Sequence, residues 1–238
     1  MILASLTACH VSSVNYDPIF RFELKTGLSN VSGRVKLGKE LLLTCAREFS
    51  MVCLKRVRRK KSIRNAEGYL DLIMVFDDRW PLKTGLRYQM ADKALESLEA
   101  ITNPQGFKPY ILFLKGQAHR AAGRYLKAIN YLEQSLRLDE ENSHNRLALA
   151  WCYKRVDNID AAIETMKTAI QQDSESAICH YNLACYYSLA DRSEECVQHL
   201  SIALDINPGY RSNVDSEADF DQLRDDPVFQ AALNVAVQ

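Results

Sequence analysis

The chain has 238 residues, enough for one elongated domain or two small ones. Its hydrophobic share of 47% is ordinary for a folded protein, which excludes disorder throughout. The formal net charge is zero, but residues 1–75 carry 13 Lys/Arg against 6 Asp/Glu, and residues 76–238 carry the opposite imbalance. The two parts could attract one another, or the basic part could engage an acidic partner.

The seven cysteines indicate a reduced compartment. Their number is odd, none forms a CxxC motif, and most stand where a small buried helix residue is expected. This usage favours a cytoplasmic protein over a disulfide scaffold. No apolar run reaches the ~18–20 residues that cross a bilayer, so no membrane span is expected.

Residues 1–34 show no lasting periodicity, and we expect this segment to be poorly ordered. The string from Leu6 to Cys9 resembles a bacterial lipoprotein cleavage box. However, no positive charge precedes it and the apolar stretch is short for a signal peptide. A lipid anchor is therefore the less favoured interpretation.

Residues 35–65 are predicted to form a helix with a basic end, because apolar residues recur at spacings of three and four. The basic patch comprises Lys55, Arg56, Arg58, Arg59, Lys60, Lys61 and Arg64. We favour a solvated helix end, where cations suit the negative pole of the helix dipole. The alternative is a contact for nucleic acid or an anionic surface, although no aromatic residue interrupts the run to stack on bases.

Residues 66–108 are predicted to form an irregular helical hairpin. Trp80-Pro81 and Gly85 indicate an extended turn between its two helices. The first helix would bury one face, formed by Tyr69, Leu70, Ile73 and Phe76.

Residues 109–210 repeat without a gap at a period of 34, in units 109–142, 143–176 and 177–210. Column 8 of each unit holds a small residue, and so do columns 20 and 27. The columns read Gly116, Ala150 and Ala184; Ala128, Ala162 and Cys196; and Ser135, Ala169 and Ala203. A period of this length predicts one helical hairpin per unit, with stacking needed to bury each apolar face.

Each hairpin needs a tight turn, and the residues at these turns fit that need. Gly123, Asp157 and Asp191 occupy equivalent positions and tolerate positive φ. Residues 211–238 are predicted to form an acidic linker and a C-terminal capping helix. In that helix Asp226 is the expected N-cap, Pro227 the first helical residue, and Val228, Phe229 and Leu233 belong to the apolar face.

The three units resemble the tetratricopeptide repeat (TPR). Small residues at columns 8, 20 and 27 allow close helix packing, while large residues fill columns 7, 11 and 24. Column 4 departs from the family pattern, with Leu112, Arg146 and His180 in place of a tryptophan. The resemblance implies an all-α, right-handed superhelical solenoid of antiparallel helix pairs. The closing segment, residues 218–229, is similar to that of many bacterial TPR proteins, which implies a bacterial source.

The resemblance also implies a concave groove, lined by the first helix of each pair, that binds a peptide or helix of an unknown protein partner. Carried over by register, the groove residues are Phe113, Gln117, Arg120, Leu147, Trp151, Lys154, Arg155, Tyr181, Asn182, Cys185 and Ser188. For Trp151, groove contact and plain packing between hairpins are equally supported. The clamp that grips a chaperone's C-terminal carboxylate is not expected, because its positions (Phe113, Gln117, Ala148, Ile178 and Asn182) lack cations.

Motifs for catalysis are missing from the sequence. The five histidines form no HExxH or metal-spaced cluster, and the sequence contains no GxxxxGK[ST], GxGxxG or GxSxG motif. Cys179 and His180 are adjacent, so they point to different sides of a helix. We expect no catalytic residue, metal or cofactor, and the leading hypothesis is a non-catalytic scaffold or adaptor. The alternatives are nucleic-acid or anionic-surface binding through residues 55–64, or a regulatory subunit of an enzyme.

Overall fold

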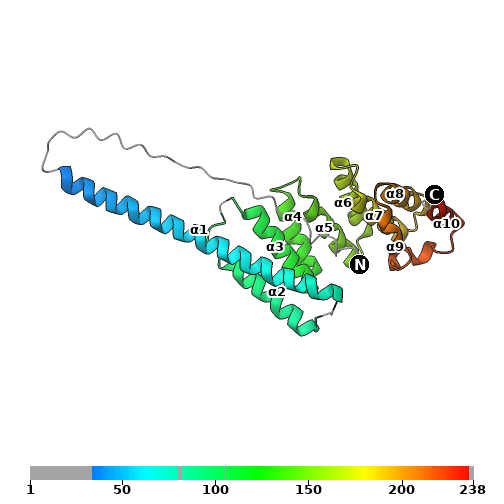
Figure 1. The fold of residues 1–238 in the computed structure, drawn as a ribbon, viewed down its shortest axis with the longest axis horizontal. Coiled ribbons are helices and arrows are strands. Elements are labelled where there is room, and N and C mark those ends of the chain that lie inside the picture. Colours follow the sequence, from blue (N-terminus) through cyan, green and yellow to red (C-terminus); the bar gives the residue numbers. More distant parts are fainter. Residues whose placement is uncertain (1–33, 80–81, 105, 236–238) are drawn as a thin grey trace. The chain divides into compact units, whose positions relative to one another are not determined.

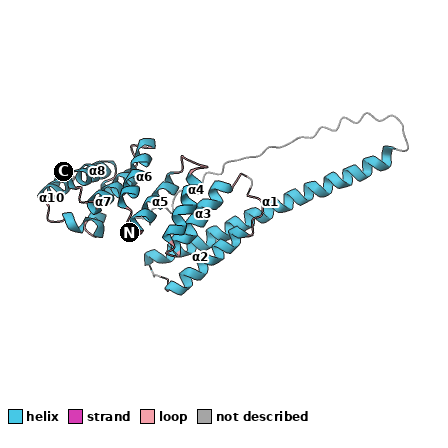
Figure 2. Ribbon diagram, turned by 180° about the vertical axis from the view of Figure 1, so that it is seen from behind, coloured by secondary structure: helices cyan, strands magenta, loops and turns pink. Residues whose placement is uncertain are grey.

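The computed structural model describes residues 34–79, 82–104 and 106–235 (Figure 1). The expectations for residues 1–33, including their order and the lipoprotein signal, lie outside these ranges. Every regular element in the described ranges is a helix (Figure 2). The chain divides after Lys61 into two compact units, and each is described by itself.

The first unit contains the start of α1, which spans Arg34–Arg79. The sequence suggested one helix over residues 35–65 and a new helix from residue 66, but α1 passes through this boundary without a break. No proline stands between residues 61 and 70, and Gly68 within a helix costs only about 1 kcal/mol. Nothing in the local sequence therefore ends the helix at the basic patch.

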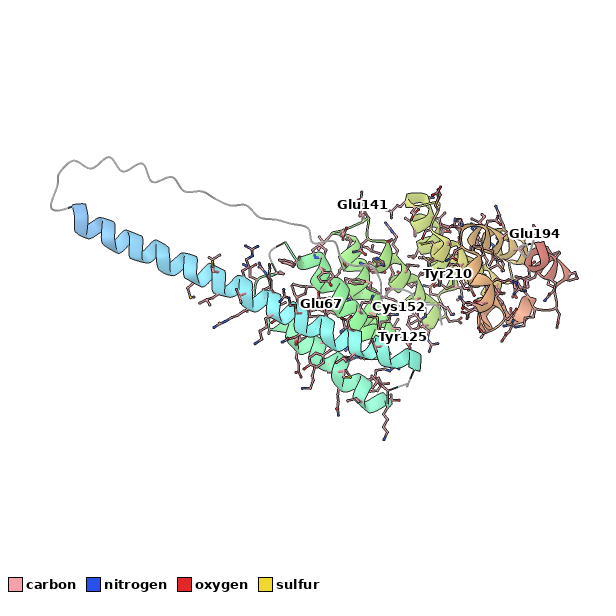
Figure 3. All side chains as sticks on the ribbon, in the orientation of Figure 1. Glu67, Tyr125, Glu141, Cys152, Glu194 and Tyr210 are labelled. Atoms are coloured by element: carbon pink, nitrogen blue, oxygen red, sulfur yellow. The ribbon has the colours of Figure 1, made fainter. Side chains whose placement is uncertain are left out.

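In the second unit, the last part of α1 packs with α2 (Thr84–Glu99) and α3 (Lys108–Ala121) around one apolar core. This core includes Ile63, Leu70 and Ile73 from α1, together with Ala94 and Leu98 from α2. A hydrogen bond of 2.8 Å from the Tyr110 hydroxyl to Glu67, which Figure 3 labels, joins α3 to α1.

Three regular helix pairs follow, as the 34-residue period predicted. They are α3 with α4 (Tyr125–Leu136), α5 (Ser143–Arg155) with α6 (Ile159–Gln172), and α7 (Ala177–Leu189) with α8 (Ser193–Ile206). Each pair packs on the next through α4 against α5 and α6 against α7. The small column-20 residues Ala128, Ala162 and Cys196 are completely buried, which is why the paired helices can lie so close.

The turns inside the three pairs have the backbone that the sequence predicted. Gly123 has φ of 66°, Asp157 of 62° and Asp191 of 55°. In the second pair both helices begin with an asparagine N-cap: the Asn142 side chain accepts from the Asn145 amide at 2.9 Å, and Asn158 accepts from Ala161 at 3.3 Å. Local sequence thus determines where the pairs turn.

The C-terminal segment comprises η2 (Pro208–Tyr210), α9 (Arg211–Val214), η3 (Ala218–Leu223) and α10 (Pro227–Val235). Where the sequence suggested only an acidic linker, short helical pieces pack η3 on α7, and α10 packs on α8. Asp226 caps α10 by accepting from the amides of Val228 (2.7 Å) and Phe229 (3.2 Å). Phe229 and Leu233 are buried as expected, but Val228 is 59% exposed and lies outside the apolar face.

Candidate partner-binding surface

Trp151 is the centre of a cluster that joins two successive repeats. It lies on α5, half-buried, with the guanidinium carbon of Arg120 at 5.3 Å and that of Arg155 at 5.6 Å from its ring centroid. Tyr125, at the start of α4 and labelled in Figure 3, contacts Trp151 edge-on at 5.5 Å and also lies 5.3 Å from Arg155. We call these four residues the Trp151 cluster. Cation–π contacts of this kind hold guanidinium groups in place over aromatic rings.

The α3 side of this surface carries Phe113 and Gln117, both half-buried. Phe113 stacks on Tyr110 with 6.2 Å between ring centroids. The Gln117 side-chain oxygen accepts a 2.7 Å hydrogen bond from Nε of Arg120, which orients the guanidinium toward Trp151. The structure therefore brings five of the predicted groove residues together along α3 and α5: Phe113, Gln117, Arg120, Trp151 and Arg155.

Lys154 has an intramolecular partner. Its ammonium forms an ion pair with Asp219 of η3, and the two side chains are only 22% and 12% exposed. Burial raises the pKa of Asp219, and the hydrogen bond from Lys154 opposes that rise. The C-terminal segment is thus joined to α5 by one charge pair, while η3 packs on α7 and α10 packs on α8.

The predicted groove residues of α7 lie beneath the C-terminal segment. Tyr181 stacks on Tyr210 (centroids 5.0 Å apart) and meets Phe220 edge-on at 5.7 Å. Tyr181, Cys185 and Ser188 are all buried. In this arrangement they contact the chain's own residues and are not accessible to a partner.

The two remaining predicted groove residues are also engaged within the chain. The Asn182 side chain, half-buried, donates to the carbonyl of Ile178 at 2.8 Å, within its own helix. Leu147 is buried and belongs to the apolar core of the second and third repeats. These two side chains therefore contribute to packing in this structure.

The buried thiols are poor nucleophiles at neutral pH. Burial raises the pKa of Cys152 and of Cys196 to about 12, and it also raises the pKa of Cys179 and of Cys185. His180, adjacent to Cys179, contacts His199 instead, with 2.9 Å between their Nδ1 atoms. Within the described part of the chain, no three His, Cys, Asp or Glu side chains form a group that could hold a metal ion.

The basic patch residues are exposed on α1, except for Arg59, which is half-buried. Successive helix residues turn by about 100°, so six cations within residues 55–61 surround the helix and do not form one face. Exposed apolar side chains precede the patch (Met51, Val52 and Leu54), and Val57 lies within it. No described helix is both long and apolar enough to cross a membrane.

Two residues of this surface were missed in the sequence analysis. Tyr125 stands at the start of a second helix, outside the columns that line the groove, but its ring reaches Trp151. Asp219 belongs to a segment without helical periodicity, so its pairing with Lys154 depends on tertiary packing. The only signal in the sequence was that the C-terminal segment is acidic, whereas the end of α5 is basic.

The comparisons with known proteins agree with this architecture. Residues 119–184 match the family model described as tetratricopeptide repeat. A crystal structure of MamA is 17% identical, covers 63% of this chain and 88% of its own, and has a TM-score of 0.53. A MamA structure from Desulfovibrio magneticus, starting at its residue 41, is 15% identical, covers 73% and 93%, and has a TM-score of 0.52. No curated protein matches the chain by sequence.

The described chain is therefore an all-α solenoid built from stacked helix pairs. Residues 119–184 match the tetratricopeptide repeat, and the fold is that of the MamA structures, so the repeat and the helical solenoid predicted from the 34-residue period are confirmed.

Proposed function

We propose that this protein is a non-catalytic scaffold that binds a segment of a partner protein along α3 and α5. The observation that carries the proposal is the Trp151 cluster, which holds two guanidinium groups beside a half-buried tryptophan at the junction of two repeats. Tryptophan, tyrosine and arginine are the residue types that dominate contact energies in protein interfaces. The corresponding residues of α7 are covered, so the proposed site ends at α5.

The C-terminal segment is too firmly held to be an easily displaced cover. Val214, Phe220, Phe229 and Leu233 are at most 3% exposed. At about 2 kcal/mol for each buried large apolar side chain, exposing all four costs on the order of 8 kcal/mol. A micromolar complex has a total binding free energy of about the same size. A partner therefore binds beside this segment and does not replace it.

Affinity capture from native cells tests the proposal. The full chain and its Trp151→Ala variant are compared as bait, with Arg192→Gln as the matched control. Arg192 also lies over an aromatic ring, 4.6 Å from the Tyr187 centroid, but belongs to the turn before α8. We expect the Trp151 variant to lose proteins that the control retains. Retention of the same proteins by all three baits would contradict the proposal.

A second candidate function is binding of nucleic acid or an anionic surface through the basic patch, because six of its seven cations are exposed. Such binding would weaken steeply with salt as counterions are released. A chain with Lys55, Arg56 and Arg58 changed to Gln should then lose affinity for a single-stranded oligonucleotide and show a shallower salt dependence. Binding that is absent or independent of salt would exclude this candidate.

The cytoplasmic location and the bacterial source also belong to this proposal. The cysteine usage supports the location, and the likeness of residues 218–229 to the closing segment of bacterial TPR proteins supports the source.

A further inference from the structure

The C-terminal segment shows which chemistry the α5 helix accepts. Its Asp219 carboxylate pairs with Lys154, and the adjacent Phe220 lies edge-on against Tyr181. An acidic residue followed by an aromatic residue is therefore already bound on the first helices of the second and third repeats. This internal contact serves as an example of a segment that this face recognises.

The next residue along α5 offers a second cation of the same kind. Arg155 is exposed and lies against both Trp151 and Tyr125. No carboxylate among the residues that the structure describes forms an ion pair with it. Because two rings hold its guanidinium, Arg155 loses little conformational freedom when it binds a carboxylate.

We propose that the partner segment is acidic and that a side-chain carboxylate of this segment binds Arg155 beside Trp151, one residue along α5 from the Lys154–Asp219 pair. This inference rests on the proposed function and names the chemistry of its partner. An aromatic residue next to the carboxylate would contact the exposed part of Trp151 and Tyr125. The bound segment would then pair with Arg155 next to the Lys154–Asp219 pair that the C-terminal segment forms.

Synthetic peptides test this chemistry on the full chain. The chain has two tryptophans, so Trp80→Phe leaves Trp151 as the only indole reporter. The probes are a 12-residue peptide with three Asp-Phe pairs, its twin with Asn-Phe pairs, and a 12-nucleotide single-stranded DNA. Both peptides are amidated at the C-terminus, so that only side-chain carboxylates are available.

We expect the Asp-Phe peptide to change Trp151 fluorescence and to bind at least tenfold more tightly than the Asn-Phe twin at low salt. Arg155→Gln should reduce this affinity at least fivefold. Arg192→Gln should leave it unchanged, because Arg192 pairs with Glu195 elsewhere on the repeats. Circular dichroism of each variant verifies that it is folded.

Three results would overturn the inference: equal affinity for the two peptides, unchanged affinity in the Arg155 variant, or tighter binding of the DNA than of the Asp-Phe peptide. Affinity capture separates this failure from that of the proposed function. If Trp151→Ala loses native partners while the two peptides bind equally, the scaffold stands and only the acidic chemistry is wrong. If Trp151→Ala loses none, the proposed function itself fails.

Discussion

At the scale of single residues, the three tight turns share one left-handed position, and only the first repeat fills it with glycine. Asp157 and Asp191 hold φ of 62° and 55°, whereas Gly123 holds 66°. A residue with a Cβ is strained in this region by about 1 kcal/mol, although aspartate tolerates it better than most residues. The second and third turns therefore retain a small strain that the first avoids.

Exchanging the turn residues should shift stability in opposite directions. Asp157→Gly should stabilise the protein by about 0.5 kcal/mol, because the relief of strain exceeds the added freedom of the unfolded chain. Gly123→Ala should destabilise it by about 1 kcal/mol. A Cβ at Gly123 would meet no atom closer than 3.9 Å, so the backbone alone causes this loss. Urea unfolding measures both, and a destabilised Asp157→Gly variant would contradict the argument.

Gly116 is required for a different reason, which is close packing between α3 and α4. A Cβ at this position would lie 2.6 Å from the Cγ and Cδ2 atoms of Leu132, which is completely buried. We expect Gly116→Ala to cost about 1–3 kcal/mol in the free energy of unfolding. The matched control is Gly68→Ala in α1, where no atom lies within 4 Å and helix propensity predicts a gain of about 0.5–1 kcal/mol. Similar effects of the two substitutions on urea unfolding would refute this explanation.

At the scale of elements, the C-terminal segment completes the apolar core of the third repeat. Phe220 is completely buried between Tyr181 and Phe229, with ring centroids 5.7 and 5.5 Å away. Without this segment, α7 would expose Tyr181, whose ring now lies against Tyr210 and Phe220. This segment therefore both stabilises the end of the stack and limits where a partner can bind.

Shortening Phe220 measures how much this element contributes. Phe220→Ala should cost about 3–5 kcal/mol and should increase the reactivity of Cys185 toward a thiol reagent, because the core above α7 opens. Val228→Ala in the same segment should change stability by less than about 0.5 kcal/mol, since Val228 is 59% exposed. Urea unfolding measures the free energy of unfolding of both variants. Equal losses of stability in the two would show that the segment is not packed as described.

At the scale of the whole molecule, two histidines make stability depend on pH. Burial first and then Arg124 lower the pKa of His119 to about 4, and burial first and then His180 lower the pKa of His199 to about 4. An unfolded histidine titrates near 6.5, so between about pH 6.5 and 4 the unfolded chain gains protons that the folded chain does not. Stability should therefore fall across this window as the pH is lowered.

We expect each histidine to contribute a loss on the order of 1 kcal/mol between pH 7 and 4, after allowance for solvent screening. The free energy of urea unfolding as a function of pH measures the slope. His199→Phe should flatten it, because this variant removes one of the two groups. A stability that rises as the pH is lowered from 6.5 to 4 would be the opposite of the expected sign.

The sequence was sufficient to predict the repeats but only part of the candidate site. Columns 8, 20 and 27 specify close packing, and each turn carries a residue that accepts positive φ, so helix pairs 109–210 could be predicted in register. The continuity of α1 was not foreseen, because the basic patch was interpreted as the end of a helix although it does not stop one. Helix propensity is a weak guide to whether a long helix such as α1 continues or ends.

Register also placed Trp151, Lys154 and Arg155 on one helix face, but it could not show which groove positions remain accessible. The covering of Tyr181 depends on Tyr210 and Phe220, whose spacing fits neither a helix nor a strand. Their burial arises from the folding of short 3₁₀ and α pieces onto α7, a tertiary effect that periodicity does not encode.

The most direct test is a photo-crosslinking scan of the full chain in native cells. A photoreactive amino acid replaces Gln117 on α3, Asn182 on α7 or, as a control on the second helix of a pair, Glu164 on α6. We predict that residue 117 crosslinks to partner proteins and that residues 182 and 164 do not. Crosslinks to the same proteins from residue 182, with none from residue 117, would contradict a partner site along α3 and α5.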